Sequence, residues 1–177
     1  APSISADGRY VAFASDASNL VPEDTLYAYD IFVHDRQTGQ TARVSVATDG
    51  TQGNNDSRGP SITADGRYVA FDSSASNLIP GDTNNARDIF VHDRQTGETA
   101  RVSIASDGTP GNDISQGATI SADGRYVVFG SYATNLVPND TNGDGDIFVH
   151  DRVTGETARV SIASDGTQAN DYAHYHS

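Results

Sequence analysis

The chain has 177 residues, enough for a domain with a sizeable core, and a formal net charge of −13. This charge would repel phosphate backbones and anionic membrane surfaces, so we do not expect nucleic-acid binding. The absence of cysteine excludes disulfides and thiolate metal sites, and no apolar run of about 18 residues is present to span a membrane. The basic residues are all arginine and the acidic residues are mostly aspartate. We expect such a chain in an extracellular or periplasmic setting.

The sequence repeats with a period of 58 residues and without insertion or deletion, so that Asp30, Asp88 and Asp146 mark equivalent points. A fixed period of this size means that one structural unit is copied and stacked. We predict a single repeat domain with three units, at about 1–59, 60–117 and 118–177. A residue that is identical in all three copies is a poor candidate for a catalyst, because an active site is rarely built three times. The chain starts at Ala1 with neither Met nor a signal peptide, so we expect it to be processed or excised.

The second copy predicts four short antiparallel strands and no helical period. An Asp-Gly pair between the first two strands is a hairpin signal, and a Gly-containing turn separates the last two. A long polar loop at 72–87 joins the second strand to the third. The predicted strands are 60–63, 68–71, 89–92 and 99–104.

Four-stranded units in tandem are typical of propeller blades. Both faces of a blade pack against neighbours, and the apolar runs 69–71 and 89–91 fit strands that are buried on both sides. The predicted fold class is therefore all-β, a β-propeller of four-stranded antiparallel blades. Three blades per chain would form half of a six-bladed ring.

The segments 3–13, 30–36 and 38–41 carry the motifs Asp-Gly-Arg-Tyr-Val-x-Phe, Asp-Ile-Phe-Val-x-Asp-Arg and Thr-Gly-x-Thr, and matching segments recur in the other copies. These motifs resemble the TolB-type, WD-repeat-like bacterial propeller blade, and the resemblance covers essentially the whole chain. It implies a propeller fold but does not specify a function, since such blades occur in periplasmic scaffolds, in secreted proteins and as lids on peptidases.

The loop between the second and third strands is the candidate metal site. In the third copy its oxygen-bearing side chains alternate and a glycine permits a sharp turn, as at the start of a Ca²⁺-binding loop. The second copy keeps fewer of them, and the first has Leu26 in place of an asparagine. The predicted Ca²⁺ ligands are Asp140, Asn142, Asp144 and Asp146 in the third copy and Asp82, Asn84 and Asp88 in the second. The alternative is a solvated, Asx-rich turn.

Three sets of triplicated residues have structural rather than catalytic interpretations. We expect the histidines to be hydrogen-bonded core groups, the serines not to form Ser-His-Asp triads, and the arginines to lie on blade surfaces and pair with aspartates. The sets are His34, His92 and His150; Ser45, Ser103 and Ser161; and Arg43, Arg101 and Arg159. The few glutamates also give no support for a paired-carboxylate glycosidase site.

Two further features have open interpretations. His174 and His176 break the repeat and could bind a transition metal, but they also fit the irregular start of a fourth blade. Tyr27 and Tyr29 could stack on a sugar or peptide, or simply pack.

The leading hypothesis is a non-catalytic propeller module that presents loops and a channel to a peptide, protein or glycan, with Ca²⁺ stiffening a loop. An accessory propeller of a secreted hydrolase or peptidase and a lectin-like sugar binder are the alternatives. Three blades leave two apolar faces that an isolated chain should not expose, so we predict a homodimer that closes a six-bladed ring.

Overall fold

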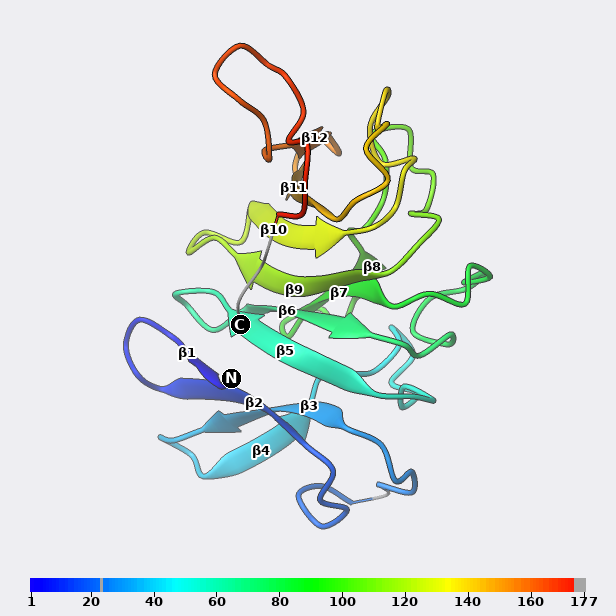
Figure 1. Ribbon diagram of the computed structural model, residues 1–177. Coiled ribbons are helices and arrows are strands. Elements are labelled where there is room, and N and C mark those ends of the chain that lie inside the picture. Colours follow the sequence, from blue (N-terminus) through cyan, green and yellow to red (C-terminus); the bar gives the residue numbers. More distant parts are fainter. Residues whose placement is uncertain (23, 174–177) are drawn as a thin grey trace.

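The computed structural model describes residues 1–22 and 24–173, and all regular elements within them are β-strands. They form three four-stranded antiparallel sheets in which the strands follow chain order, from the first strand at one edge to the fourth at the other. Figure 1 shows the three sheets stacked face to face in chain order. The strands are β1 (Ser3–Ile4), β2 (Tyr10–Ser15), β3 (Asp30–Asp35), β4 (Gln40–Arg43), β5 (Ser57–Ile62), β6 (Tyr68–Ser73), β7 (Asp88–Asp93), β8 (Thr99–Arg101), β9 (Ser115–Ile120), β10 (Tyr126–Ser131), β11 (Asp146–Asp151) and β12 (Thr157–Arg159).

The predicted all-β propeller class is confirmed, and all four predicted strands of the second copy differ from the observed strands at one or both ends. β5 begins at Ser57, because a bulge between Arg58 and Ser61 extends its pairing with β6, and Gly59 takes a φ of 59° within it. The fourth strand of the second copy ends at Arg101, and the chain continues to a single bridge between Ile104 and Pro110. Among the described residues no helix is long and apolar enough to cross a membrane.

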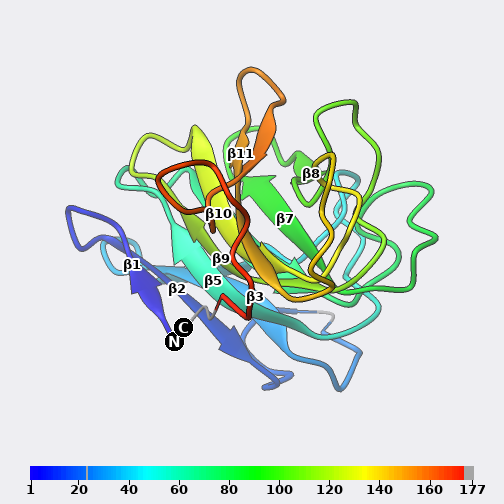
Figure 2. The same cartoon turned by 45° about the horizontal axis from the view of Figure 1, so that its top comes forward.

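The sheets are arranged as blades around a common inner edge. The first strand of the second sheet, β5, contacts the first strands of both other sheets, β1 and β9, and Figure 2 shows the three along one side of the stack. Two apolar layers fill the spaces between successive sheets. In β3, Ile31 belongs to the layer shared with the second sheet and the next residue, Phe32, is equally buried on the other face. This explains the continuous apolar runs of the third strands.

The hydrogen bonds between sheets repeat in the same way as the sequence. Ala6 N donates to Ala64 O at 2.9 Å, and Ala64 N donates to Ala122 O at 3.1 Å. Ile62 N donates to Ser3 Oγ, and the equivalent Ile120 N donates to Ser61 Oγ. Each sheet is therefore joined to the next by equivalent bonds.

The two outer faces of the stack expose residues that are buried in the other copies. Val160 on the third sheet is 48% exposed, while its counterparts Val44 and Val102 are 2% and 3% exposed. On the opposite face of the first sheet Ile4 is 56% exposed, while Ile62 and Ile120 are 7% and 6% exposed. The stack thus ends in two open blade faces.

Candidate functional site

The predicted metal loop of the third copy is organised around an arginine. Nη1 of Arg159 lies 3.2 Å from Oδ1 of Asp140 and 3.2 Å from Oδ2 of Asp146, and all three side chains are nearly buried. Gln168 Nε2 donates to the same two carboxylates, and Ser161 Oγ donates to the second oxygen of Asp146. These two predicted ligands are thus brought together, with a guanidinium between them.

The other two predicted ligands of this loop have different partners. Asn142 Nδ2 donates to Ala169 O, and Asn142 Oδ1 accepts a bond from the backbone N–H of Asp144. Among the described residues no three His, Cys, Asp or Glu side chains are grouped so as to hold a metal ion.

The same arginine-centred arrangement occurs in the first two copies. Arg101 Nη1 lies 3.0 Å from Asp82 Oδ1 and 3.0 Å from Asp88 Oδ2, and Asn84 Nδ2 adds a bond to Asp88. Asn84 takes the place of the missing glutamine, because the second copy has Pro110 there. In the first copy Arg43 pairs with Asp24 and Asp30, and Gln52 bonds both carboxylates.

These arginines correct one expectation from the sequence. They pair with aspartates as predicted, but they do not lie on the blade surface: the side chains of Arg43, Arg101 and Arg159 are only 11%, 8% and 12% exposed. Burial raises the pKa of the Asp30 and Asp82 carboxyls, and the adjacent guanidinium opposes that effect. As arranged, Arg159 supplies the positive charge between the two carboxylates of the third-copy loop.

Two of the triplicated histidines, His92 and His150, belong to hydrogen-bond chains that run between sheets. His92 Nδ1 is 2.9 Å from Thr99 Oγ1, and that hydroxyl donates to Val46 O of the preceding sheet. Thr99 must then accept from His92, which assigns the proton to Nδ1. His150 and Thr157 repeat the arrangement toward Ile104 O. His92 and His150 are buried core groups, as expected, whereas His34 bonds Thr41 in the same way but is only partly buried.

No triad is formed by the triplicated serines. Ser103 Oγ donates to Asp88 and accepts from Ile89 N, while the nearby histidine bonds a threonine instead. The described residues contain no catalytic Ser-His-Asp arrangement. His174 and His176, the two C-terminal histidines with an open interpretation, lie outside the described residues.

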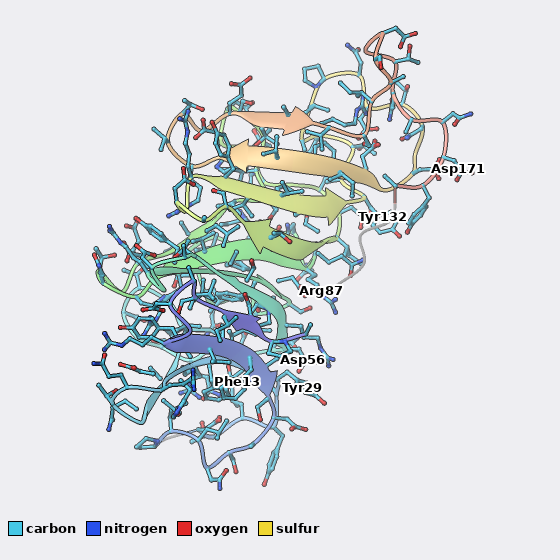
Figure 3. The ribbon with its side chains drawn as sticks, turned by 90° about the vertical axis from the view of Figure 1, so that its left-hand side faces the viewer. Phe13, Tyr29, Asp56, Arg87, Tyr132 and Asp171 are labelled. Atoms are coloured by element: carbon cyan, nitrogen blue, oxygen red, sulfur yellow. The ribbon has the colours of Figure 1, made fainter. Side chains whose placement is uncertain are left out.

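A groove of about 670 Å³ runs along the inner edge of the blades. Its lining comes from all three sheets and combines charged side chains with apolar ones. It includes Phe13, Tyr29, Arg58, Asp72, Arg87 and Gln116. Figure 3 shows Tyr29, Asp56 and Arg87 following one another along this side of the molecule. The volume is within the usual range for ligand sites.

The charged side chains of the groove form one network. The Arg58 guanidinium lies 4.1 Å from the centroid of the Tyr29 ring and donates to Asp56 at 2.9 Å. Arg87 Nη1 lies 3.3 Å from Gln116 Oε1 and 3.6 Å from Asp72 Oδ2. Burial raises the pKa of Asp72, and the charge of Arg87 counteracts the shift. Tyr29 thus packs against an arginine of the next blade.

The groove collects positions at which the three copies disagree. Where the second copy has Arg87, the first has Tyr29 and the third has Gly145; where the second has Asp72, the others have Ala14 and Gly130. The blade architecture evidently does not require these side chains, since other copies form the same sheet without them. Sequence reasoning missed the groove, although a comparison of the copies position by position would have marked it.

The comparisons with known proteins agree with the fold. No family model and no curated protein matches the chain. The structure resembles TolB from Acinetobacter baumannii with a TM-score of 0.57 and 21% identity, over 94% of this chain and 35% of that one. It also resembles a putative TolB from Agrobacterium tumefaciens (TM-score 0.55, 20% identity, 89% and 47% of the two chains). An acylaminoacyl peptidase from Pyrococcus horikoshii gives a TM-score of 0.52 at 15% identity, over 89% and 23% of the chains.

The chain is therefore built of TolB-like β-propeller blades, and it spans about a third to a half of the two TolB chains. At these identities the similarity establishes the fold alone.

Proposed function

We propose that this chain is a non-catalytic propeller module that binds a partner protein in the inner-edge groove. The observation that carries the proposal is the convergence of copy-specific side chains there. Tyr29, Arg58, Asp72 and Arg87 come from two different blades, yet they meet in one network. Residues that the blade does not need, gathered at one place, favour a binding role over a structural one.

The chemistry of the groove favours a carboxylate on the partner. Arg58 uses only Nη2, and Arg87 only Nη1, in hydrogen bonds and ion pairs with the described residues. Each guanidinium therefore keeps further N–H donors, which suit the two oxygens of a carboxylate. Asp56 and Asp72 hold the two arginines in place. An extended segment with an Asp or Glu side chain, or a free C-terminus, matches these donors.

An array of short peptides tests this proposal. We expect the purified chain to prefer peptides with a carboxylate side chain or a free C-terminus, and Arg58→Gln and Arg87→Gln to abolish that preference. Arg125→Gln is the control, because it removes the same charge outside the groove. Amidated C-termini separate the two carboxylate sources. Equal binding by the groove variants and the control would contradict the proposal.

The accessory role in a hydrolase is the second candidate, because some similar structures are peptidases, among them a prolyl endopeptidase and the acylaminoacyl peptidase. The sequence flanking this segment in its gene would decide that question. The lectin-like alternative would be tested on a glycan array. We also propose an extracellular or periplasmic location, on the basis of composition.

Self-assembly is part of the proposed function, since the two open faces expose apolar residues that are covered in the other copies. Calcium binding by the third-copy loop stays a prediction from sequence. An ion there would have to displace the guanidinium of Arg159 from Asp140 and Asp146.

A further inference from the structure

The junction between the first and second sheets and the junction between the second and third sheets contain the same set of contacts. The guanidinium of Arg94, on the second sheet, lies 4.3 Å from the centroid of the Tyr10 ring on the first, and Arg152 lies 4.1 Å from the Tyr68 ring. Thr99 bonds Val46 O and Thr48 Oγ1, and Thr157 bonds the equivalent Ile104 O and Ser106 Oγ. The backbone N–H groups of Ala6 and Ala64, and those of Ile62 and Ile120, also bond the neighbouring sheet in equivalent ways.

Each open face carries one half of this set. The third sheet has the ring of Tyr126, which is 39% exposed, and the acceptors Ile162 O, Ser164 Oγ and Thr119 Oγ1. The first sheet has the matching donors Arg36, Thr41 and the Ile4 N–H. Within the described chain Arg36 bonds only Gly8 O, and Thr41 Oγ1 bonds only His34. The halves are complementary, but they lie at opposite ends of the stack.

The apolar surfaces of the two faces are complementary as well. At the described junctions Ala12, Val33 and Val44 of one sheet pack against Ile62, Phe71 and Leu78 of the next. The third sheet offers Val128, Val149 and Val160 at the first set of positions. The first sheet offers Ile4, Phe13 and Leu20 at the second set. A second copy of this chain presents both the apolar and the polar pattern.

We propose that the open face of the third sheet binds the open face of the first sheet in a second copy of this chain, in the register of the described junctions. The inference rests on the self-assembly in the proposed function and adds its contacts: Arg36 on Tyr126, Thr41 on Ile162 O and Ser164, the Ile4 N–H on Thr119, and Ala122 N on Ala6 O. A twofold axis makes two such junctions and closes six blades, within the usual range of propellers, whereas three copies would give nine.

Cysteine cross-linking tests the register directly, because the chain has no cysteine of its own. The pair Ala6→Cys and Ala64→Cys spans a described junction and should close within one chain on oxidation or with a short bismaleimide. The pair Ala6→Cys and Ala122→Cys spans the proposed junction. We expect it to give a covalent dimer, twice the 18.6 kDa of one chain, without higher ladders. Monomer alone would overturn the proposal, and a ladder would replace the closed ring by an open filament.

A second measurement decides if the cysteine variants fail to fold or the internal pair does not close. Val160→Asp places a charge on the open face of the third sheet, and Val153→Asp is the control on a turn, where the native side chain is 74% exposed. Gel filtration should show a dimer for wild type and Val153→Asp and a monomer for Val160→Asp. Equal elution of all three would overturn the proposal. Neither experiment measures peptide binding. A negative result here would therefore contradict the dimer and leave the proposed peptide binding in the groove untouched.

Discussion

The guanidinium of Arg94 covers the ring of Tyr10 on the neighbouring sheet, 4.3 Å from its centroid, and donates to Gly66 O of its own sheet. The same ring leaves no space for a side chain at Gly66, because an added Cβ would lie 2.2 Å from it. In each of the first two blades one tyrosine, Tyr10 or Tyr68, is thus enclosed by the next blade. In the third sheet Tyr126 has only its own Arg125 as a cation–π partner among the described residues.

Replacing the enclosed tyrosine should therefore cost more than replacing the open one. We expect Tyr68→Ala to lower the free energy of unfolding by about 3 kcal/mol, the lower end for aromatic truncations, because Tyr68 is partly buried against the core. Tyr126→Ala should cost under about 1 kcal/mol when measured on dilute, monomeric chain. Urea unfolding followed by circular dichroism measures both variants. Equal losses at high dilution would contradict the enclosure of Tyr68 by the third sheet.

The buried arginines should matter more than the exposed ones. Arg101→Ala leaves the carboxylates of Asp82 and Asp88 without their cation, and breaking such a buried pair typically costs about 3–5 kcal/mol. Arg58→Ala, whose ion pair is largely exposed, should cost about 1 kcal/mol or less. Denaturant midpoints compare the two. A loss at Arg101 as small as that at Arg58 would refute a structural role for the arginine.

The core histidines make stability depend on pH. Burial lowers the pKa of His92 and His150 from the ordinary 6.5, so the unfolded chain binds more protons than the folded chain below that pH. The contribution of these histidines to the free energy of unfolding should therefore be complete above pH 6.5 and decrease as the pH falls below 6.5. His92→Ala should cost about 1–3 kcal/mol at pH 8 and weaken the pH dependence. An unchanged slope in the variant would exclude His92 as a contributor.

A second decline is expected at lower pH. The hydrogen bonds from Arg67 lower the pKa of Asp93 from the ordinary 3.8 to about 2. Its contribution to stability is present above pH 3.8 and is lost as the pH falls through 2. Arg67→Gln should raise this pKa, which carbon-13 NMR of the carboxyl group can follow. A titration of Asp93 unaffected by the substitution would contradict the assignment.

Calcium titration addresses the remaining prediction from sequence. If Ca²⁺ binds at Asp140 and Asp146, the Tm should rise with the ion and Asp140→Asn should remove the effect, with about 2.7 kcal/mol expected at a hundred times Kd. Asp144→Asn tests whether the loop rearranges to bring in the third carboxylate. A Tm that is constant across millimolar Ca²⁺ would leave Arg159 as the cation of this site.

The fold could be predicted from the sequence because the turn and strand patterns that define it lie within short segments of the chain. The Asp-Gly turns and the doubly apolar third strands such as Ile89–Val91 recur in every copy, so each unit could be read alone. The site did not follow, because its contacts join segments that are far apart in the chain. The closeness of Arg159 to Asp140 and Asp146 depends on the pairing of β11 with β12, and the alternation of oxygens in the loop resembled a metal site without showing this partner.

The groove was hidden for a related reason. Arg58 and Tyr29 meet only because the second blade packs on the first, and neither belongs to a motif. What the sequence did contain was their difference from the other copies. In a repeat protein, residues that are identical in every copy indicate what the fold requires. Residues that differ between copies and gather at one place indicate a binding site.

The mass of the 177-residue chain in solution tests the central claim most directly. Static light scattering at micromolar concentration and physiological salt should give twice 18.6 kDa, the mass of a six-bladed ring made from two chains. A folded, stable species of 18.6 kDa under the same conditions would contradict the account, because both blade faces would then remain open to water.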